Sequence, residues 1–282
     1  MNIFEAIILG IIQGITEFLP ISSTGHLTVA GKLMNIISPE HPEQWTAFIA
    51  VIQLGTLAAV LVYFRKDIIK IINSFLNENL SARKKFAEQS YDSKLGWLII
   101  IGTIPVVIVG LSLKHIIEGT LTKDLYVIAG SLIGLAIILA LAEMVAKFKK
   151  EIKDLSIKDS IIIGIAQCFA LIPGSSRSGT TITGGLFIGL NREAAARFSF
   201  LLSIPAVLAS GLLELYESLA FLNSSMVLNL IISTIVSGIS GYLAIDFLLK
   251  YLRKNTTFLF IYYRIALGIL IIVLLSLNVF QP

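Results

Sequence analysis

Residues 13–26 read Gln-Gly-Ile-Thr-Glu-Phe-Leu-Pro-Ile-Ser-Ser-Thr-Gly-His, and this polar stretch follows the apolar run Ile7–Thr16. The run is well short of the roughly 20 residues that a helix needs to cross a bilayer. A second short run, Ile161–Ile172, leads in the same way into Pro-Gly-Ser-Ser-Arg-Ser-Gly-Thr-Thr at 173–181. Runs of this length predict re-entrant segments, in which a helix enters the membrane, breaks at a loop and turns back. Two ordinary kinked spans are the alternative.

The composition places these segments in a membrane protein. Of 282 residues, 56% are apolar and 14% charged, whereas a soluble domain carries about 25% charged residues. The mean hydropathy is +0.87. This composition excludes a disordered chain, a nucleic-acid-binding protein and a disulfide-stapled scaffold, since Cys168 is the only cysteine. The N-terminus has no basic residue before Lys32, so we expect no cleavable secretory signal.

Six further runs are long enough to span the bilayer. They are Trp45–Phe64, Leu95–Leu113, Leu125–Ala142, Phe198–Leu213, Met226–Ile245 and Thr256–Leu277. The sequence therefore predicts an all-α integral membrane protein, a single domain over 1–282. It has six transmembrane helices and two re-entrant helix-loop-helix segments, at about 3–37 and 159–190.

The basic residues orient these spans. Segment 65–94 has seven Lys and Arg residues and segment 147–158 has five, whereas segments 38–44 and 216–225 have none. Cytoplasmic loops carry an excess of Lys and Arg, so we expect the two basic segments inside and both termini outside. The two re-entrant segments then enter from opposite faces.

The two short runs also resemble each other. Gly10-Ile-Ile-Gln13 matches Gly164-Ile-Ala-Gln167, and Pro-Ile-Ser-Ser at 20–23 matches Pro-Gly-Ser-Ser at 173–176, one residue nearer its glutamine. Together with the opposite orientations, this similarity predicts an inverted-topology repeat with halves at about 1–146 and 158–282. In such repeats, broken helices meet near the midplane and form the binding site.

Ionisable side chains inside the hydrocarbon are costly and point to function. Glu17 and His26 lie at the first break, with Gln13 one helical turn before Glu17, and Arg177 lies at the second break. Arginine binds phosphate oxygens bidentately, and helix N-termini favour anions. The sequence therefore predicts a phosphorylated ligand. Its expected contacts are the hydroxyls around the breaks: Ser22, Ser23, Thr24, Ser175, Ser176, Ser178, Thr180 and Thr181.

The residue types leave the chemistry open. A Glu beside a His can perform acid–base work or bind a metal, and a serine near them can be the nucleophile. The nucleophile can equally be histidine or water. Structural roles compete with these: hydroxyls can satisfy backbone groups, Glu17 and Arg177 can form a structural pair, and Gln13 and Gln167 can simply hold the breaks together. Arg264 is expected near the cytoplasmic end of the last span, where it snorkels to water.

Both motifs resemble signatures of the undecaprenyl-diphosphate phosphatases, the bacitracin-resistance family. Residues 13–26 are similar to the first signature, which has Glu or Gln, three residues, Glu, and then a Ser-Ser-Thr-Gly-His string. Residues 173–181 are similar to the second, Pro-Gly-x-Ser-Arg-Ser-x-x-Thr. The resemblance extends over essentially the whole chain. It implies six spans plus two re-entrant helix pairs in the bacterial plasma membrane, with a site that opens to the outer, periplasmic face.

The resemblance also implies an activity and residue roles. The family hydrolyses undecaprenyl diphosphate to the monophosphate and phosphate, which recycles the lipid carrier for peptidoglycan. Glu17 and Gln13 match metal- or water-handling positions, and a divalent cation (Mg²⁺ or Ca²⁺) is the expected cofactor. Ser23 and His26 match proposed nucleophile and acid–base positions, and Arg177, Ser176 and Thr181 match phosphate-binding positions. A neutral amide at Gln13 lowers the expected metal affinity.

Two other classes of function remain as alternatives. A secondary transporter or a lipid-carrier flippase can use the same inverted-repeat pocket, with Glu17 and His26 as a proton relay. A structural membrane subunit does not explain two matched polar clusters. The expected partners are the polyprenyl diphosphate, the bilayer and a second copy of the chain in a homodimer, with no nucleic acid.

Overall fold

Six long apolar helices form the body of the protein. The computed structural model describes residues 1–38, 40, 42–114, 124–219 and 224–279. In these ranges, six helices are long and apolar enough to cross a membrane, which confirms the six predicted spans. They are α3 (Pro42–Tyr63), α5 (Tyr91–Ser112), α7 (Leu125–Val145), α10 (Arg192–Ser218), α11 (Ser224–Leu252) and α12 (Phe258–Ser276). The base-poor segments 38–44 and 216–225 lie partly outside the described residues.

Two pairs of shorter helices carry the polar motifs. The first pair is α1 (Ile3–Phe18) and α2 (Ser23–Leu33), and the second is α8 (Ile157–Cys168) and α9 (Arg177–Phe187). We call them the first and second hairpins. The other short elements are α4 (Arg65–Leu76), a π-helix at Asn77–Ser81, and 3₁₀ turns at Phe86–Glu88, Ile152–Asp154 and Phe169–Leu171.

Each break between the paired helices begins before a proline. Leu19 has ψ 138° before Pro20, and Ile172 has ψ 125° before Pro173. A residue that precedes proline is pushed out of the α region, because the proline ring collides with its backbone. Proline also lacks the N–H that would continue the helix. The two prolines therefore end α1 and the 3₁₀ turn that extends α8.

The second helix of each hairpin starts with the same unusual cap. Ser22 and Ser176 have positive φ angles, 78° and 69°, and their hydroxyls each accept a hydrogen bond, from the backbone N–H of Gly25 and Gly179, at 3.1 Å in both cases. Each serine lies nine residues after its glutamine. The pairing of Ser22 with Ser175 that the sequence suggested was therefore wrong by one residue. The two hairpins align without a gap from the glutamine (Gln13 or Gln167) to the serine cap (Ser22 or Ser176).

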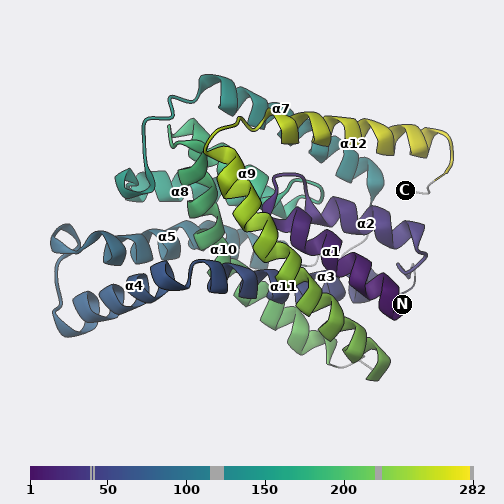
Figure 1. Ribbon diagram of the computed structural model, residues 1–282, viewed down its shortest axis with the longest axis horizontal. Coiled ribbons are helices and arrows are strands. Elements are labelled where there is room, and N and C mark those ends of the chain that lie inside the picture. Colours follow the sequence, from purple (N-terminus) through teal and green to yellow (C-terminus); the bar gives the residue numbers. More distant parts are fainter. Residues whose placement is uncertain (39, 41, 115–123, 220–223, 280–282) are drawn as a thin grey trace.

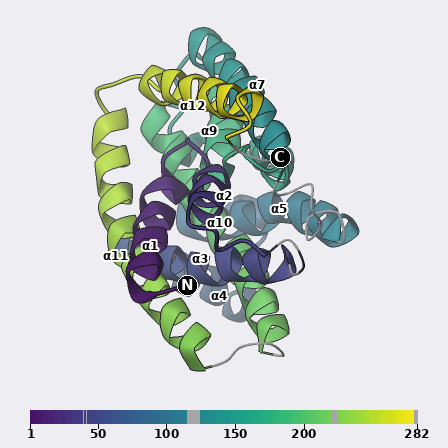
Figure 2. The ribbon, with the colours of Figure 1, turned by 90° about the vertical axis from the view of Figure 1, so that its right-hand side faces the viewer.

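The first helix of each hairpin packs tightly against a long helix. α1 packs on α11 and α8 packs on α5; Figure 2 shows α1 alongside α11, and α12 alongside α7. A Cβ added at Gly10 would lie 2.6 Å from the Ser233 carbonyl, and one at Gly164 would lie 2.3 Å from the Gly102 carbonyl. Small residues permit such close approach between membrane helices. The matched glycines thus fix both hairpins in the bundle.

The helix ends separate the molecule into two sides. α1 begins and α12 ends at the same end of the molecule, and the α4–α5 hairpin forms the opposite end (Figure 1). Large apolar side chains are exposed along the long helices, such as Ile108 and Leu111 on α5 and Ile239 and Leu243 on α11. An exposed apolar surface of this extent is what lipid contact requires. The protein is a multi-pass membrane protein.

Candidate active site

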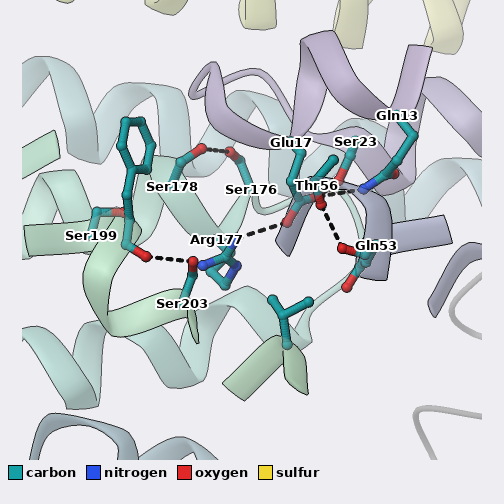
Figure 3. Close-up of polar contacts among 12 residues, drawn as sticks. Gln13, Glu17, Ser23, Gln53, Thr56, Ser176, Arg177, Ser178, Ser199 and Ser203 are labelled. Carbon is teal, nitrogen blue, oxygen red and sulfur yellow. Dashed lines mark hydrogen bonds and ion pairs between the residues drawn. The ribbon is translucent and has the colours of Figure 1, made fainter. Parts of the chain in front are cut away.

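The Glu17 carboxylate joins the two hairpins. Arg177 donates from Nη2 to Glu17 Oε1 at 2.8 Å, across 160 positions of sequence. Gln13 Nε2 and Ser23 Oγ donate to Oε2 at 2.9 and 2.8 Å, and these side chains converge in Figure 3. Glu17 is 5% exposed. A buried charge needs a partner of opposite sign and further hydrogen bonds, and Glu17 has both. The predicted meeting of the two breaks is therefore observed for these side chains.

A cavity of about 370 Å³ lies where the hairpins meet. Its polar wall comes from the two breaks and includes Glu17, Ser22, Ser23, Thr24, Ser175, Ser176 and Arg177. Its apolar wall comes from α3, α5 and α10 and includes Trp45, Ile49, Val106, Val107, Leu111, Val207 and Leu213. A site that combines these walls suits a ligand with a polar head and a hydrocarbon tail.

The polar wall favours an anion. Ser23 and Arg177 are the first residues of α2 and α9, so both helices present the N–H groups of a first turn beside the cavity, where the helix dipole is positive. Arg177 Nη1 and Ser175 Oγ are buried and have no hydrogen-bond partner among the described residues. These donors can bind the oxygens of a phosphate group.

Ser23 has the geometry of an activated nucleophile. Its hydroxyl donates to the Glu17 carboxylate at 2.8 Å and its side chain lines the cavity. A serine is activated by an adjacent base within hydrogen-bond reach, and Glu17 occupies that position. Arg177 holds the other oxygen of the same carboxylate, which fixes the orientation of the base.

His26 is directed away from the Glu17 cluster. Its Nδ1 lies 2.6 Å from the Ser22 carbonyl, which can only accept, so Nδ1 carries a proton. Its Nε2 lies 2.7 Å from the Tyr263 hydroxyl, and the two rings stack with centroids 5.6 Å apart. His26 does not line the cavity. The predicted acid–base role of His26 stays a prediction, and both ring nitrogens have protein partners in this conformation.

Three of the predicted phosphate contacts, Ser178, Thr180 and Thr181, bond within the protein and do not line the cavity. Ser178 Oγ donates to the Leu19 carbonyl at 3.1 Å, a contact between the two breaks. Thr181 Oγ1 donates to the Arg177 carbonyl at 2.7 Å and lies 2.6 Å from Ser199 Oγ. Ser22, Thr24, Ser175 and Ser176 do line the cavity.

The expectation that Arg264 snorkels to water was wrong. Arg264 is 0% exposed, and its Nη2 donates to the Ser175 carbonyl at 2.9 Å. Ser131, on α7, donates to the neighbouring Pro173 carbonyl. Polar residues of transmembrane segments often face the bundle interior and pair with backbone carbonyls. The break of the second hairpin provides such carbonyls, and this explains the burial of Arg264.

Several polar cavity residues were not singled out as ligands from the sequence, among them Gln53 and Glu214. Gln53, on α3, lines the same cavity as Glu17 and is labelled in Figure 3. It is an isolated amide in the apolar run Trp45–Phe64, and this isolation was the available signal. Glu214, on α10, also lines the cavity.

The donor set suits a cation that shares its ligands with a substrate. In the described part of the chain, no group of three or more His, Cys, Asp or Glu side chains could hold a metal. Glu17 is a carboxylate at the cavity, and the adjacent Gln13 Oε1 is buried without a partner among the described residues. Mg²⁺ is often held by one or two carboxylates together with substrate phosphates. These two side chains fit that mode of binding.

Comparison with known proteins agrees with this geometry. The family model "Bacitracin resistance protein BacA" matches residues 6–270. An undecaprenyl-diphosphatase of Syntrophobacter fumaroxidans is 58% identical over 95% of both chains. Those of Chloroherpeton thalassium and Chlorobaculum tepidum are 52% and 50% identical, over 99% and 100% of this chain and 98% and 100% of theirs. The chain therefore belongs to the BacA bacitracin-resistance protein family.

Proposed function

We propose that the protein is a membrane phosphatase that hydrolyses undecaprenyl diphosphate to undecaprenyl phosphate and inorganic phosphate. This reaction recycles the lipid carrier for peptidoglycan synthesis. One observation carries the proposal. A cavity with one apolar wall is lined on its polar side by Ser23, Glu17 and Arg177, and both Ser23 and Arg177 donate hydrogen bonds to the Glu17 carboxylate. The names of the relatives, undecaprenyl-diphosphatase, point to the same substrate.

Arg177 and the two helix N-termini bind the diphosphate head. Phosphoryl transfer is catalysed mainly by positioning and by stabilising charge on the phosphoryl oxygens. Arg177 Nη1 and Ser175 Oγ are two donors at the second break that have no partner among the described residues and can bind those oxygens. The prenyl chain lies along the apolar wall between α3, α5 and α10, so the head reaches the buried site while the tail remains in hydrocarbon.

Ser23 attacks the terminal phosphorus. Its Oγ forms the new P–O bond while Glu17 takes the hydroxyl proton. The bond from that phosphorus to the bridging oxygen breaks, and undecaprenyl phosphate leaves with the proton from Glu17. Water then attacks the phosphoserine, Glu17 accepts a proton from the water, and Glu17 passes it to Ser23 Oγ as inorganic phosphate is released. A Mg²⁺ or Ca²⁺ ion held by Glu17, Gln13 and the diphosphate would neutralise charge on the substrate. His26 holds the Ser22 carbonyl next to Ser23.

The two hairpins are proposed to be re-entrant segments of an inverted repeat, with halves at about 1–146 and 158–282. The matching caps at Ser22 and Ser176 support this proposal. The helix packing supports it too, because α1 of the first half packs on α11 of the second half, and α8 of the second half packs on α5 of the first half. The basic segments around α4 and after α7 support a cytoplasmic location for that end of the molecule.

On this topology, the protein lies in the bacterial plasma membrane, with both termini and the opening of the cavity on the outer face. A cysteine introduced at Asn2 is expected to react with a membrane-impermeant maleimide on intact spheroplasts, while one at Lys153 is not. Labelling at Lys153 alone would reverse the orientation. A homodimer stays a prediction, which light scattering of the protein in detergent tests.

The activity is tested with purified protein in detergent micelles. The wild-type protein is expected to release inorganic phosphate from undecaprenyl diphosphate, and chelation by EDTA is expected to lower the rate. A transporter or flippase needs two compartments and releases nothing under these conditions. No phosphate release with or without added Mg²⁺ or Ca²⁺ would overturn the proposal in favour of that alternative.

A further inference from the structure

Gln167 on α8 has a buried side chain that is unpartnered within the described part of the chain. It is 0% exposed, and neither Nε2 nor Oε1 has a hydrogen-bond partner among the described residues. It also lines the cavity. Buried polar side-chain atoms are nearly always hydrogen-bonded, because an unpaired one is costly. An amide kept at this position therefore calls for a ligand.

The equivalent residue of the first hairpin shows what Gln167 lacks. Gln13 Nε2 donates to the Glu17 carboxylate, four residues further along the same helix, at 2.9 Å. Four residues after Gln167 the chain has Leu171, in the 3₁₀ turn Phe169–Leu171, and Leu171 lines the cavity. An apolar side chain thus stands where the first hairpin has an anion. The second hairpin thus has the glutamine, but none of the described residues supplies an anionic partner for it.

The cavity places Gln167 among other donors of the second hairpin. Ser175 Oγ and Arg177 Nη1 line the same cavity and likewise have no partner among the described residues. Three side chains able to donate, with no carboxylate in the sequence from Gln167 to Arg177, form a surface complementary to negatively charged oxygen.

We infer that Gln167 binds substrate directly, and that its amide donates to a phosphate oxygen of the bound diphosphate as Gln13 donates to Glu17. This inference rests on the proposed function and assigns a further residue to its site. Gln167 donates to the phosphate oxygens together with Arg177 and Ser175. The affinity for a ligand is therefore expected to rise with the number of phosphate oxygens that contact the second hairpin.

Gln167→Leu tests the inference, because leucine removes both polar atoms at similar volume. The kcat/KM for undecaprenyl diphosphate is expected to fall about 10- to 100-fold, the worth of a hydrogen bond to a charged group. The Tm without ligand is expected to stay equal or rise, since no protein hydrogen bond is lost. The increase in Tm on adding inorganic diphosphate is expected to shrink.

Ser160→Ala on the same helix is the matched control. Ser160 is buried and donates to the Leu98 carbonyl at 2.5 Å, away from the cavity. This variant is expected to lower Tm and to keep the wild-type kcat/KM and the wild-type response to diphosphate. The two variants thus distinguish a residue that binds the ligand from a residue that stabilises the fold.

A lowered Tm with unchanged kcat/KM in Gln167→Leu would overturn the inference, because it would make the amide structural. Wild-type kcat/KM and a wild-type response to diphosphate would overturn it as well. If the wild-type protein itself released no phosphate, the proposed function would fail, and the diphosphate-induced shift in Tm would decide the role of Gln167 on its own.

Discussion

The two hairpins share one backbone conformation at their breaks but carry different polar side chains there. Both break at a proline, and both restart a helix of the same length from a serine cap with positive φ. The next residue is Ser23 in the first hairpin and Arg177 in the second. The first hairpin also carries the Glu17 carboxylate next to its break, whereas the second has no carboxylate from Gln167 to Arg177. Asp159, at the start of α8, pairs with Lys150. The comparison indicates that the shared backbone positions two helix N-termini. In the proposed mechanism, the side chains then make one hairpin reactive and the other anion-binding.

The largest effect is expected from removing the cation of the second hairpin. Arg177→Ala should lower phosphate release by about 10³-fold or more, because a charge that stabilises the transferred phosphoryl group is lost. Arg177→Lys should recover only part of the activity, since an ammonium lacks the planar fork. The initial rate in detergent measures both.

Arg197 provides the control for this comparison. It is an arginine on α10 that pairs with Asp67 at 2.8 Å, and it does not line the cavity. Arg197→Ala should keep near-normal turnover. If Arg177→Ala kept near-normal turnover too, while eluting as folded protein, the second hairpin would have no role in binding the phosphoryl group.

The next effect concerns the reactive side of the first hairpin. Ser23→Ala should lower kcat by about 10³-fold or more, as the loss of a nucleophile does in other hydrolases. Wild-type protein quenched in acid during turnover should carry a phosphate on Ser23, detected by mass spectrometry. Phosphate on another residue would exclude Ser23 as the nucleophile. Ser178→Ala is the control: it removes a contact to the Leu19 carbonyl, and its phosphate should still be found on Ser23.

A smaller effect is expected from the support of the second hairpin by α12. Arg264→Met removes the donor to the Ser175 carbonyl and should reduce kcat/KM by about 10- to 100-fold, as a slight misplacement of binding groups does. Arg253→Met, which removes an exposed pair with Glu193, should change it little. An Arg264→Met rate within twofold of wild type would show that the break holds its shape without this contact.

The smallest effect tests the common cap. Ser22→Ala and Ser176→Ala should each destabilise the protein by about 1 kcal/mol, while glycine at either position should cost less, because it adopts positive φ without strain. Ser156, which caps α8 with φ −100°, is the control, since glycine has no such advantage there. Thermal unfolding in detergent compares the three sites. Equal losses for alanine and glycine at Ser22 and Ser176 would contradict the strained geometry.

Much of this architecture could be predicted from the sequence because the membrane imposes length and polarity. The six spans follow from long apolar runs, of which the last contains one charged residue, Arg264. The two breaks follow from Pro20 and Pro173 after runs that are too short. The one-residue error in pairing Ser22 followed from aligning those prolines, whereas the two hairpins are in register at the serine caps. The backbone angles at the caps set that register, and the residue types in the sequence give little indication of those angles.

The site was predicted less completely than the fold. Glu17, Ser23 and Arg177 stood out because polar groups are rare in apolar sequence. The burial of Arg264 could not be predicted, because a lone arginine near a helix end is equally compatible with snorkelling, and only the packing of α12 beside the second hairpin decides between them. The orientation of His26 toward Tyr263 depends on the same packing.

The central claim is that the two hairpins form one site through the contact between Glu17 and Arg177. Phosphate release from undecaprenyl diphosphate by wild type, Ser23→Ala, Arg177→Ala and the double variant tests it most directly. The account predicts that each single variant loses nearly all activity and that the double variant is no worse than the poorer single, because residues of one catalytic unit are strongly non-additive. A single variant of either hairpin that releases phosphate at close to the wild-type rate would contradict the account.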